Sequence, residues 1–429
     1  MRIKRLEFEN FRNLADGEIF PDAGINVIYG NNAQGKTNLL EAVWLFTGGH
    51  SFRGNKDSEL VRIGSEKKET SLHTDFFSET RDQKASLIIS RGKRSSVING
   101  IEKKTGTALV GKICAVIFSP EHLLLVKEGP SRRRNFIDAA LCQTRPSYVK
   151  VLSQYNRSVL QRNALLKAIA KQPSLESTLD VWDDRLVHFG AEVIRERYGY
   201  IEKLMPSVEE IYRGISRDKE KISLEYEINC VKNCVKNAVK KSAVNSMVSL
   251  MENSPADYSA EIDKTYGEAA EEQAASVITA GFGAESREIL TPGALEEILS
   301  ASLEKNRETD LRLGFTSSGP HKDDINFRLN GVSVRTFASQ GQQRSVVLAL
   351  KLAEAEILEK SIGEPPLILL DDVMSELDSS RQDYLLNHLE GRQVFITCCS
   401  PDTVSLMRTG KRIYVENGTV TAESMTQPE

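Results

Sequence analysis

The spacing of apolar and polar residues changes character three times along the chain. Near the start, short apolar stretches predict strands at about residues 3–11, 17–20 and 25–29, and residues 38–46 follow with helical spacing. From about residue 70 to residue 118 the pattern predicts further strands, with Asn99-Gly100 as a hairpin turn. The first part of the chain is therefore predicted to be α/β and rich in strands.

The middle of the chain has a helical pattern. Residues 131–212 are rich in Leu, Arg, Glu and Ala, and Pro146, Pro173 and Pro206 are expected to interrupt the helices. The stretch 229–291 is poor in aromatic residues and is expected to be a mobile insertion or a weakly ordered surface. Helical order is expected to resume near residues 294–306.

The last third returns to an α/β pattern. A strand and turn are expected at 324–331, and a helix with one apolar face at 342–360. Apolar strands are expected at 367–370, 394–397 and 413–415. The predicted organisation is an α/β head built from both ends of the chain, residues 1–128 and 312–429, with an inserted, mainly helical arm domain at 129–311.

A phosphate-binding loop follows the third predicted strand. Residues 30–37 fit the pattern G-x-x-x-x-G-K-[ST], and the loop lies between a strand and a helix, which is the context the motif requires. Lys36 is expected to reach the β- and γ-phosphates of ATP, and the Thr37 hydroxyl to bind Mg²⁺. The loop residues expected to bind ATP are Gly30, Asn31, Asn32, Ala33, Gln34, Gly35, Lys36, Thr37 and Asn38.

Two carboxylates follow the apolar strand at 367–370. Asp371 and Asp372 would reach the phosphate loop at the carboxyl ends of the strands of a parallel sheet. We expect Asp371 to be a metal ligand beside Thr37. We expect Asp372 and Lys36 to be catalytic, with Asp372 orienting or deprotonating the water that attacks the γ-phosphate.

The helix at 342–360 begins with a polar segment, Ser339, Gln340, Gly341 and Gln342. Ser339 is a good N-cap, so a purely structural interpretation is open. The same exposed N–H groups and positive helix dipole can also bind an anion. The sequence leaves both roles open.

In this order, the motifs resemble the ABC-type ATPase heads and, among them, the RecF family, which is related to SMC and Rad50 proteins. The resemblance covers almost the whole chain outside 229–291 and is carried by Glu9–Asn13, Gly35–Ala42, Phe118–Leu123, Ser131–Asp138, Gly319–Asp324 and Leu370–Asp378. It implies an ABC-type head that slowly hydrolyses ATP with Mg²⁺, dimerises around two ATP molecules, and places Arg12 and Asn13 beside the nucleotide.

The resemblance also assigns residues to the dimer interface. Ser339, Gln340, Gly341 and Gln342 would form the signature segment that caps the γ-phosphate bound to the opposing subunit, and Asp378 would lie at the dimer seam. Transporter ATPases usually have Glu at the position of Asp372 and a histidine sensor after the last core strand. Here Thr397 is the nearest substitute for that histidine.

The family further implies a partner set. It predicts double-stranded DNA beside single-strand gaps, an ATP-dependent homodimer, RecR and RecO as protein partners, and RecA indirectly, in recombinational repair and replication restart. A net charge of −4 and a pI of about 6.0 argue against binding DNA by bulk charge, so local basic residues must do so. The candidates are Arg53, Lys56, Arg132, Arg133 and Arg134.

The alternative function is that of an SMC- or Rad50-like protein that tethers chromosomes or DNA ends. Such proteins need long heptad arms and a C-x-x-C zinc hook, whereas the arm here is short and broken by prolines. Cys230 and Cys234 are one residue too far apart for that hook. No apolar run is long enough to cross a bilayer, and nothing resembles a secretory signal, so a cytoplasmic location is expected.

Overall fold

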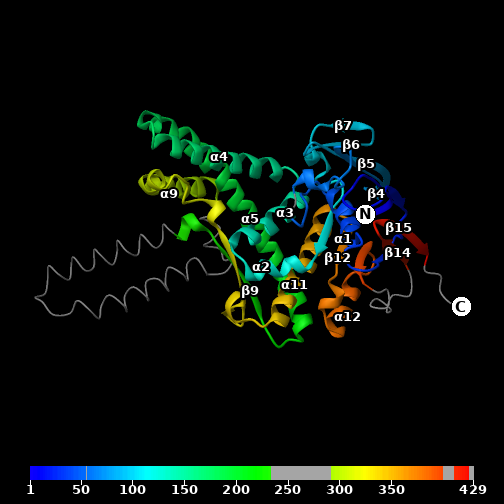
Figure 1. Cartoon of the computed structure of the whole chain (residues 1–429). Coiled ribbons are helices and arrows are strands. Elements are labelled where there is room, and N and C mark those ends of the chain that lie inside the picture. The colour runs from blue at the N-terminus through cyan, green and yellow to red at the C-terminus, as the bar shows by residue number, and fades with distance from the viewer. Residues whose placement is uncertain (55, 233–290, 400–409, 425–429) are drawn as a thin grey trace, which may run out of the picture.

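The computed structural model describes residues 1–54, 56–232, 291–399 and 410–424 (Figure 1). Most of the stretch predicted to be weakly ordered, 233–290, lies outside the described residues. Within them, the structure has two six-stranded sheets, one three-stranded sheet and a set of long helices.

A mainly parallel sheet forms the centre of the head, in the order β15-β14-β3-β13-β12-β8. The strands from β8 to β14 pair in parallel, and β15 pairs antiparallel with β14. All residues of β8, β12 and β13 are buried, as expected for apolar strands covered on both faces. The strands are β3 (Ile25–Tyr29), β8 (Ala115–Phe118), β12 (Leu367–Asp371), β13 (Val394–Cys398), β14 (Lys411–Glu416) and β15 (Thr419–Ser424).

An antiparallel sheet from the N-terminal part lies beside it, in the order β2-β1-β4-β5-β6-β7. Burial alternates along β4, so one face packs on helix α1 (Lys36–Leu45) within a shared apolar core. Asn99 and Gly100 both have positive φ, as the predicted hairpin turn requires. The strands are β1 (Arg2–Glu9), β2 (Gly17–Ile19), β4 (Glu69–Ser78), β5 (Arg81–Ser90), β6 (Lys93–Ile98) and β7 (Ile101–Lys103).

The helices of the middle and last parts are longer than the patterns predicted. Helix α11 covers Gln340–Ile362, and α9 covers Pro292–Leu313. The others named below are α2 (Leu124–Lys127), α3 (Pro130–Thr144), α4 (Tyr148–Ile169), α5 (Leu179–Ser216), α10 (Val334–Phe337) and α12 (Ser379–His388).

Helix α5 corrects one prediction. Pro206 was expected to interrupt a helix, but it lies inside the 38 residues of α5. A proline in a helix removes one backbone hydrogen bond and crowds the preceding turn. Leu204, Val208 and Ile211 on either side are fully buried, and this packing stabilises the continuous helix.

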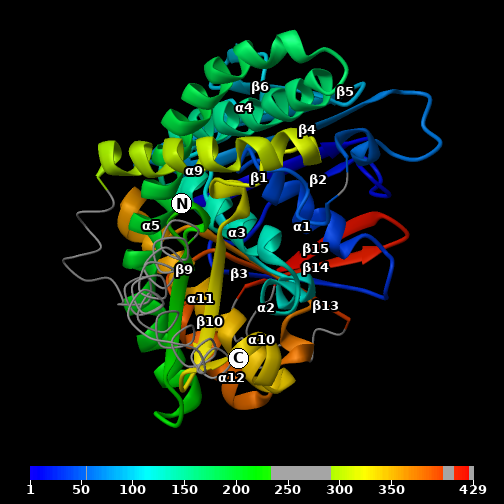
Figure 2. The same cartoon turned by 90° about the vertical axis from the view of Figure 1, so that its left-hand side faces the viewer.

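The arm consists of α4, α5 and α9, which lie side by side and extend from the head (Figures 1 and 2). Helix α5 then runs back along α11. One apolar cluster continues from β8 and α11 through α5 to α9, so the arm and the head share a core. The boundaries at 128/129 and 311/312 therefore stay a prediction.

A small antiparallel sheet follows the end of α5. It pairs β9 (Ile222–Glu227) with β10 (Asp324–Leu329), and β10 with β11 (Val332–Ser333). Strand β11 leads through α10 into α11, so this sheet lies next to the segment that begins at Ser339.

Within the described ranges, no helix is both long and apolar enough to span a bilayer.

Candidate nucleotide site

The phosphate loop connects β3 to α1, where the backbone must turn sharply. Gly30 and Gly35 have φ values of 145° and 118°, which side chains rarely permit. A Cβ at Gly30 would overlap the carbonyl oxygen of Val415, and one at Gly35 would lie 2.9 Å from Asn13 Oδ1. The loop is also fixed at Gln34, whose Oε1 accepts a hydrogen bond from the Asn417 N–H, 2.5 Å away. Both glycines are therefore required by their surroundings.

Lys36 folds over the loop. Its Nζ donates to the carbonyl oxygens of Gly30 (2.6 Å) and Asn31 (3.0 Å). The ammonium group thus lies across the concave side of the loop, where a phosphate chain bound at the N-terminus of α1 would meet it. The geometry suits the nucleotide-binding role predicted for Lys36.

Asp371 and Thr37 come together although 334 residues separate them. Thr37 Oγ1 donates to Asp371 Oδ1 at 2.8 Å, and Thr397 Oγ1 donates to the same oxygen at 2.9 Å. Burial raises the pKa of Asp371, while these two hydrogen bonds lower it. A hydroxyl and a carboxylate are hard oxygen ligands that Mg²⁺ uses together with phosphate oxygens and water, so this pair fits the ion.

Thr397 has a different role from the one considered for it. Its side chain is 1% exposed, accepts a hydrogen bond from the Asp372 N–H (2.9 Å) and donates to Asp371. Both hydrogen-bonding functions of the hydroxyl are engaged with the carboxylate pair. It therefore positions Asp371 and Asp372 and does not point a free hydroxyl at a γ-phosphate.

Asp372 lies at the exposed end of the pair. Its backbone is left-handed, with φ of 53°, and its carboxylate accepts a hydrogen bond from Ser375 Oγ at 3.1 Å. The turn of the backbone separates the two carboxylates: Asp371 points into the protein and Asp372 is exposed. One can hold a metal while the other contacts water.

Side chains from three segments meet over the loop. Asn38 Nδ2 donates to Asn13 Oδ1 at 2.6 Å, and Arg53 Nη1 donates to Asn38 Oδ1 at 2.9 Å. Arg53 also lowers the pKa of Asp371, although burial dominates there. Arg53, predicted to contact DNA, is therefore close to the phosphate loop. Asn13 lies beside the same loop, and its contact with ATP stays a prediction.

The Arg12 guanidinium is hydrogen-bonded to a buried carboxylate, that of Glu41. Its Nε and Nη2 donate to Glu41 at 2.9 and 3.1 Å, and Ser51 Oγ also donates to Glu41. The Glu41 side chain is fully buried on α1. Sequence reasoning missed Glu41, because a single glutamate in an apolar helical stretch gives no sign of its partner.

The segment at Ser339 begins α11 in an exposed position. Ser339 Oγ accepts from the Gln342 N–H at 3.3 Å, and the Ser339 N–H donates to Gln342 Oε1 at 2.7 Å, which forms a capping box. Asp378 caps α12 by accepting from the Arg381 N–H at 3.0 Å. Both predicted dimer-interface positions are exposed in the single chain.

The three arginines at 132–134 are largely structural. Arg133 is 3% exposed and forms a two-pronged ion pair with Asp324, at 2.7 and 3.0 Å. Arg134 donates to the Asp323 carbonyl, and Arg132 pairs with Glu128. The prediction of a DNA contact is therefore corrected for Arg133, whose charge is neutralised in the interior between α3 and β10.

Comparison with known proteins agrees with this geometry. A family model described as RecF/RecN/SMC N terminal domain matches residues 2–422. The DNA replication and repair protein RecF of Agathobacter rectalis is 36% identical over 94% of this chain and 93% of its own. The protein of the same name from Acetivibrio thermocellus is 35% identical over 97% of this chain and 98% of its own. The chain belongs to the RecF family.

Solved structures place the fold in the same family. The chain resembles the recombination mediator protein RecF-ATPrS of the RecFOR pathway, with a TM-score of 0.80 and 34% identity over 99% of this chain and 98% of that one. An Smc head bound to the C-terminal domain of ScpA, from Pyrococcus furiosus, has a TM-score of 0.50 at 15% identity over 98% of this chain and 96% of that one. The second likeness shows the fold alone.

Proposed function

We propose that the protein is an ATP-dependent switch in DNA repair, which dimerises on ATP and binds duplex DNA near single-strand gaps. Membership of the RecF family and the assembled phosphate loop support this proposal. Two relatives are described as recombination mediators of the RecFOR pathway, one of them bound to ATP. By that likeness, RecR and RecO are proposed partners, and RecA an indirect one.

The observation that carries the dimer proposal is the environment of Gly341. Among the described residues, and apart from its chain neighbours and the nearby backbone of its own helix, a Cβ at this position would meet no atom closer than 3.9 Å, and its φ is not positive. Nothing in the described part of the chain therefore requires a glycine at this position, and a glycine weakens the helix. The close approach of another molecule, such as the triphosphate bound to a second copy, would provide that reason.

The proposed chemistry assigns one task to each side chain. Lys36 binds the β- and γ-phosphates, and Thr37 with Asp371 would hold Mg²⁺, which neutralises phosphate charge when bound. Asp372 orients the attacking water, and Thr397 keeps both carboxylates in place. Asp is one methylene shorter than the usual Glu, so we propose slow hydrolysis that releases the dimer.

A basic surface for DNA is proposed on the N-terminal sheet. Lys56, Lys68, Arg91 and Lys93 are all exposed, and in the described part of the chain none of them forms an ion pair. Their segments are contiguous, since the Arg91 N–H donates to the Lys68 carbonyl and Gly92 lies against Ser58. Backbone phosphates are the ligands that such a group of cations suits.

Sedimentation velocity of the full chain tests the switch. We expect monomers with ADP and dimers with ATP and Mg²⁺. Lys36→Arg should remain folded but stay monomeric, because the loop loses its phosphate contact. Ser339→Arg should bind fluorescent ATP like the wild type yet remain monomeric. Monomeric wild type with saturating ATP, or loss of ATP binding in Ser339→Arg, would contradict the proposed arrangement.

A further inference from the structure

Helix α5 connects the arm to the region of the signature segment. Its 38 residues correspond to about 57 Å, and it begins at Leu179 in the arm and ends at Ser216 beside α11 and α12. Figures 1 and 2 both show it descending from α4 and α9 toward α12. The two ends of one rigid element therefore lie in different functional regions.

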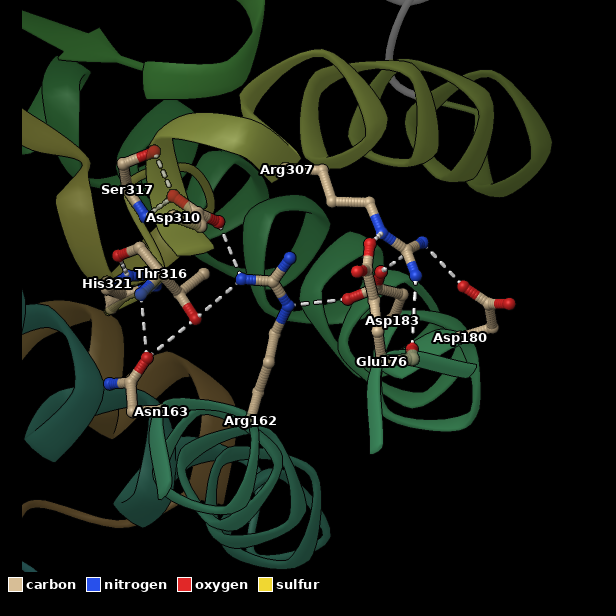
Figure 3. A network of polar contacts seen from close by, with 10 residues as sticks. All are labelled: Arg162, Asn163, Glu176, Asp180, Asp183, Arg307, Asp310, Thr316, Ser317 and His321. Carbon is tan, nitrogen blue, oxygen red and sulfur yellow. Dashed lines mark hydrogen bonds and ion pairs between the residues drawn. The ribbon is translucent and has the colours of Figure 1, made fainter. Parts of the chain in front are cut away.

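The arm end of α5 is held by a buried ion network (Figure 3). The fully buried Arg162 of α4 pairs with Asp183 of α5 at 2.5 Å and with Asp310 of α9 at 2.6 Å. Removing one member of such a network leaves an uncompensated buried charge, so the three helices are strongly held in one arrangement. A displacement of the arm would be passed along α5.

The other end of α5 holds a carboxylate next to the signature segment. Tyr212 Oη donates to Glu220 Oε2 at 2.6 Å, and Gln342 Nε2 donates to Glu220 Oε1 at 2.5 Å. Glu220 lies in the turn between α5 and β9 and is half-buried. Its two oxygens thus connect a residue of the arm helix with one residue of the segment 339–342.

The side chain of Gln342 makes two hydrogen bonds, one at the start of α11 and one to Glu220. Gln342 Oε1 accepts from the Ser339 N–H, while its Nε2 donates to Glu220. An amide side chain has one oxygen acceptor and one NH₂ donor, so the two contacts together determine its orientation. Glu220 therefore sets the amide that caps the start of α11.

The same turn also contacts the helix that follows Asp378. Arg217 Nη2 donates to Ser380 Oγ at 2.9 Å, and Gly214 lies against the ring of Tyr384. A Cβ at Gly214 would be 2.7 Å from Tyr384 Cε2, so α5 and α12 approach each other without space between them. The end of α5 and the turn after it therefore contact Gln342 of the signature segment and α12, the helix that Asp378 caps.

We infer that Glu220 is a positioning residue for the signature segment, through which the arm helix α5 sets the geometry that Ser339 and Gly341 present to the ATP of a second copy. This inference rests on the proposed ATP-dependent dimer. It adds a route by which a displacement of the arm changes the affinity of the two heads for each other.

Dimerisation with ATP tests the inference in the full chain. Glu220→Ala should weaken dimer formation about tenfold, as expected for the loss of a charge-assisted hydrogen bond, with unchanged binding of fluorescent ATP to the monomer. Glu220→Gln keeps an acceptor oxygen and should recover most of the affinity. Tyr212→Phe should give an intermediate loss. Glu210→Ala, which removes an exposed carboxylate from α5, should match the wild type.

Hydrogen exchange of the monomer gives a second readout that needs no dimer. Glu220→Ala should speed the exchange of amides 339–344, and Glu210→Ala should not. Wild-type dimerisation and exchange in Glu220→Ala would overturn the inference and leave the proposed function standing. If the wild type itself stays monomeric with ATP, the proposed function fails, and unchanged exchange in Glu220→Ala would then refute the positioning role separately.

Discussion

At the residue scale, the nucleotide site depends on hydroxyl groups that orient carboxylates. Asp371 receives hydrogen bonds from both Thr37 and Thr397, and Thr397 also accepts the Asp372 N–H. The Thr397 hydroxyl is buried, so its loss would leave that N–H without its partner. A buried hydroxyl can therefore determine the geometry of both carboxylates at the site.

Thr397→Val should lower ATP turnover about tenfold or more, because the valine keeps the shape but orients neither carboxylate. Nucleotide binding measured without Mg²⁺ should change little, since Lys36 and the loop are untouched. Thr397→Ser retains the hydroxyl and serves as the control. Turnover measured across a range of Mg²⁺ concentrations checks the prediction, and wild-type turnover in Thr397→Val would contradict it.

At the element scale, the short helix Pro320–Lys322 is held to α4 by a neutral histidine. His321 Nδ1 lies 2.6 Å from Tyr155 Oη, and Nε2 lies 3.0 Å from the Thr316 carbonyl oxygen. The carbonyl can only accept, so Nε2 carries the proton and Nδ1 accepts from the tyrosine. Burial lowers the pKa of His321 to about 4.

The folding contribution of His321 should depend on pH. Between about pH 6.5 and pH 4 the unfolded chain binds a proton that the folded chain does not, so this stabilisation is present above pH 6.5 and lost as pH falls toward 4. The loss amounts to about 3 kcal/mol at most. The free energy of unfolding of His321→Gln should therefore approach the wild-type value as pH falls.

Urea unfolding of both proteins at each pH measures that difference. Comparison at equal pH cancels the contribution of Asp323, whose pKa burial raises to about 6 and which therefore changes stability in the opposite direction. A difference between His321→Gln and wild type that stays constant from pH 7 to pH 4.5 would show that the histidine does not titrate as described.

At the scale of the whole molecule, charge is distributed unevenly. The net charge is −4, yet four exposed cations gather on the N-terminal sheet and its loops. Arg133 and Arg134, in contrast, hold α3 against Asp324 of β10 and the preceding Asp323. The net charge of the chain is therefore negative, whereas this local surface is positively charged. Only the local surface decides whether phosphates bind.

Replacing Lys56, Lys68, Arg91 and Lys93 by alanine should weaken binding to gapped duplex DNA and reduce its dependence on salt. Each lost phosphate contact should lower the slope of log affinity against log salt by about one. Fluorescence anisotropy with ATP at several salt concentrations measures this slope. Lys305→Ala with Lys360→Ala, two exposed lysines elsewhere, is the control. An unchanged slope would exclude this surface.

Local pattern was enough to determine much of this protein. The glycines of the phosphate loop, the apolar strand before Asp371 and the N-cap at Ser339 are each specified by neighbours within a few residues. Each of these motifs lies within a short stretch of sequence, so it can be recognised without knowledge of the fold. They also predicted the family, which the comparisons show.

Tertiary structure alone decided which distant residues meet. Thr397 reaches Asp371, Glu41 holds Arg12, Asp324 neutralises Arg133, and Glu220 holds Gln342. Pro206 remains helical because buried neighbours on both sides stabilise the helix against its intrinsic propensity. A hydrogen bond or an ion pair depends on positions set by packing, and residues separated by tens to hundreds of positions carry no local mark of the partner they will find.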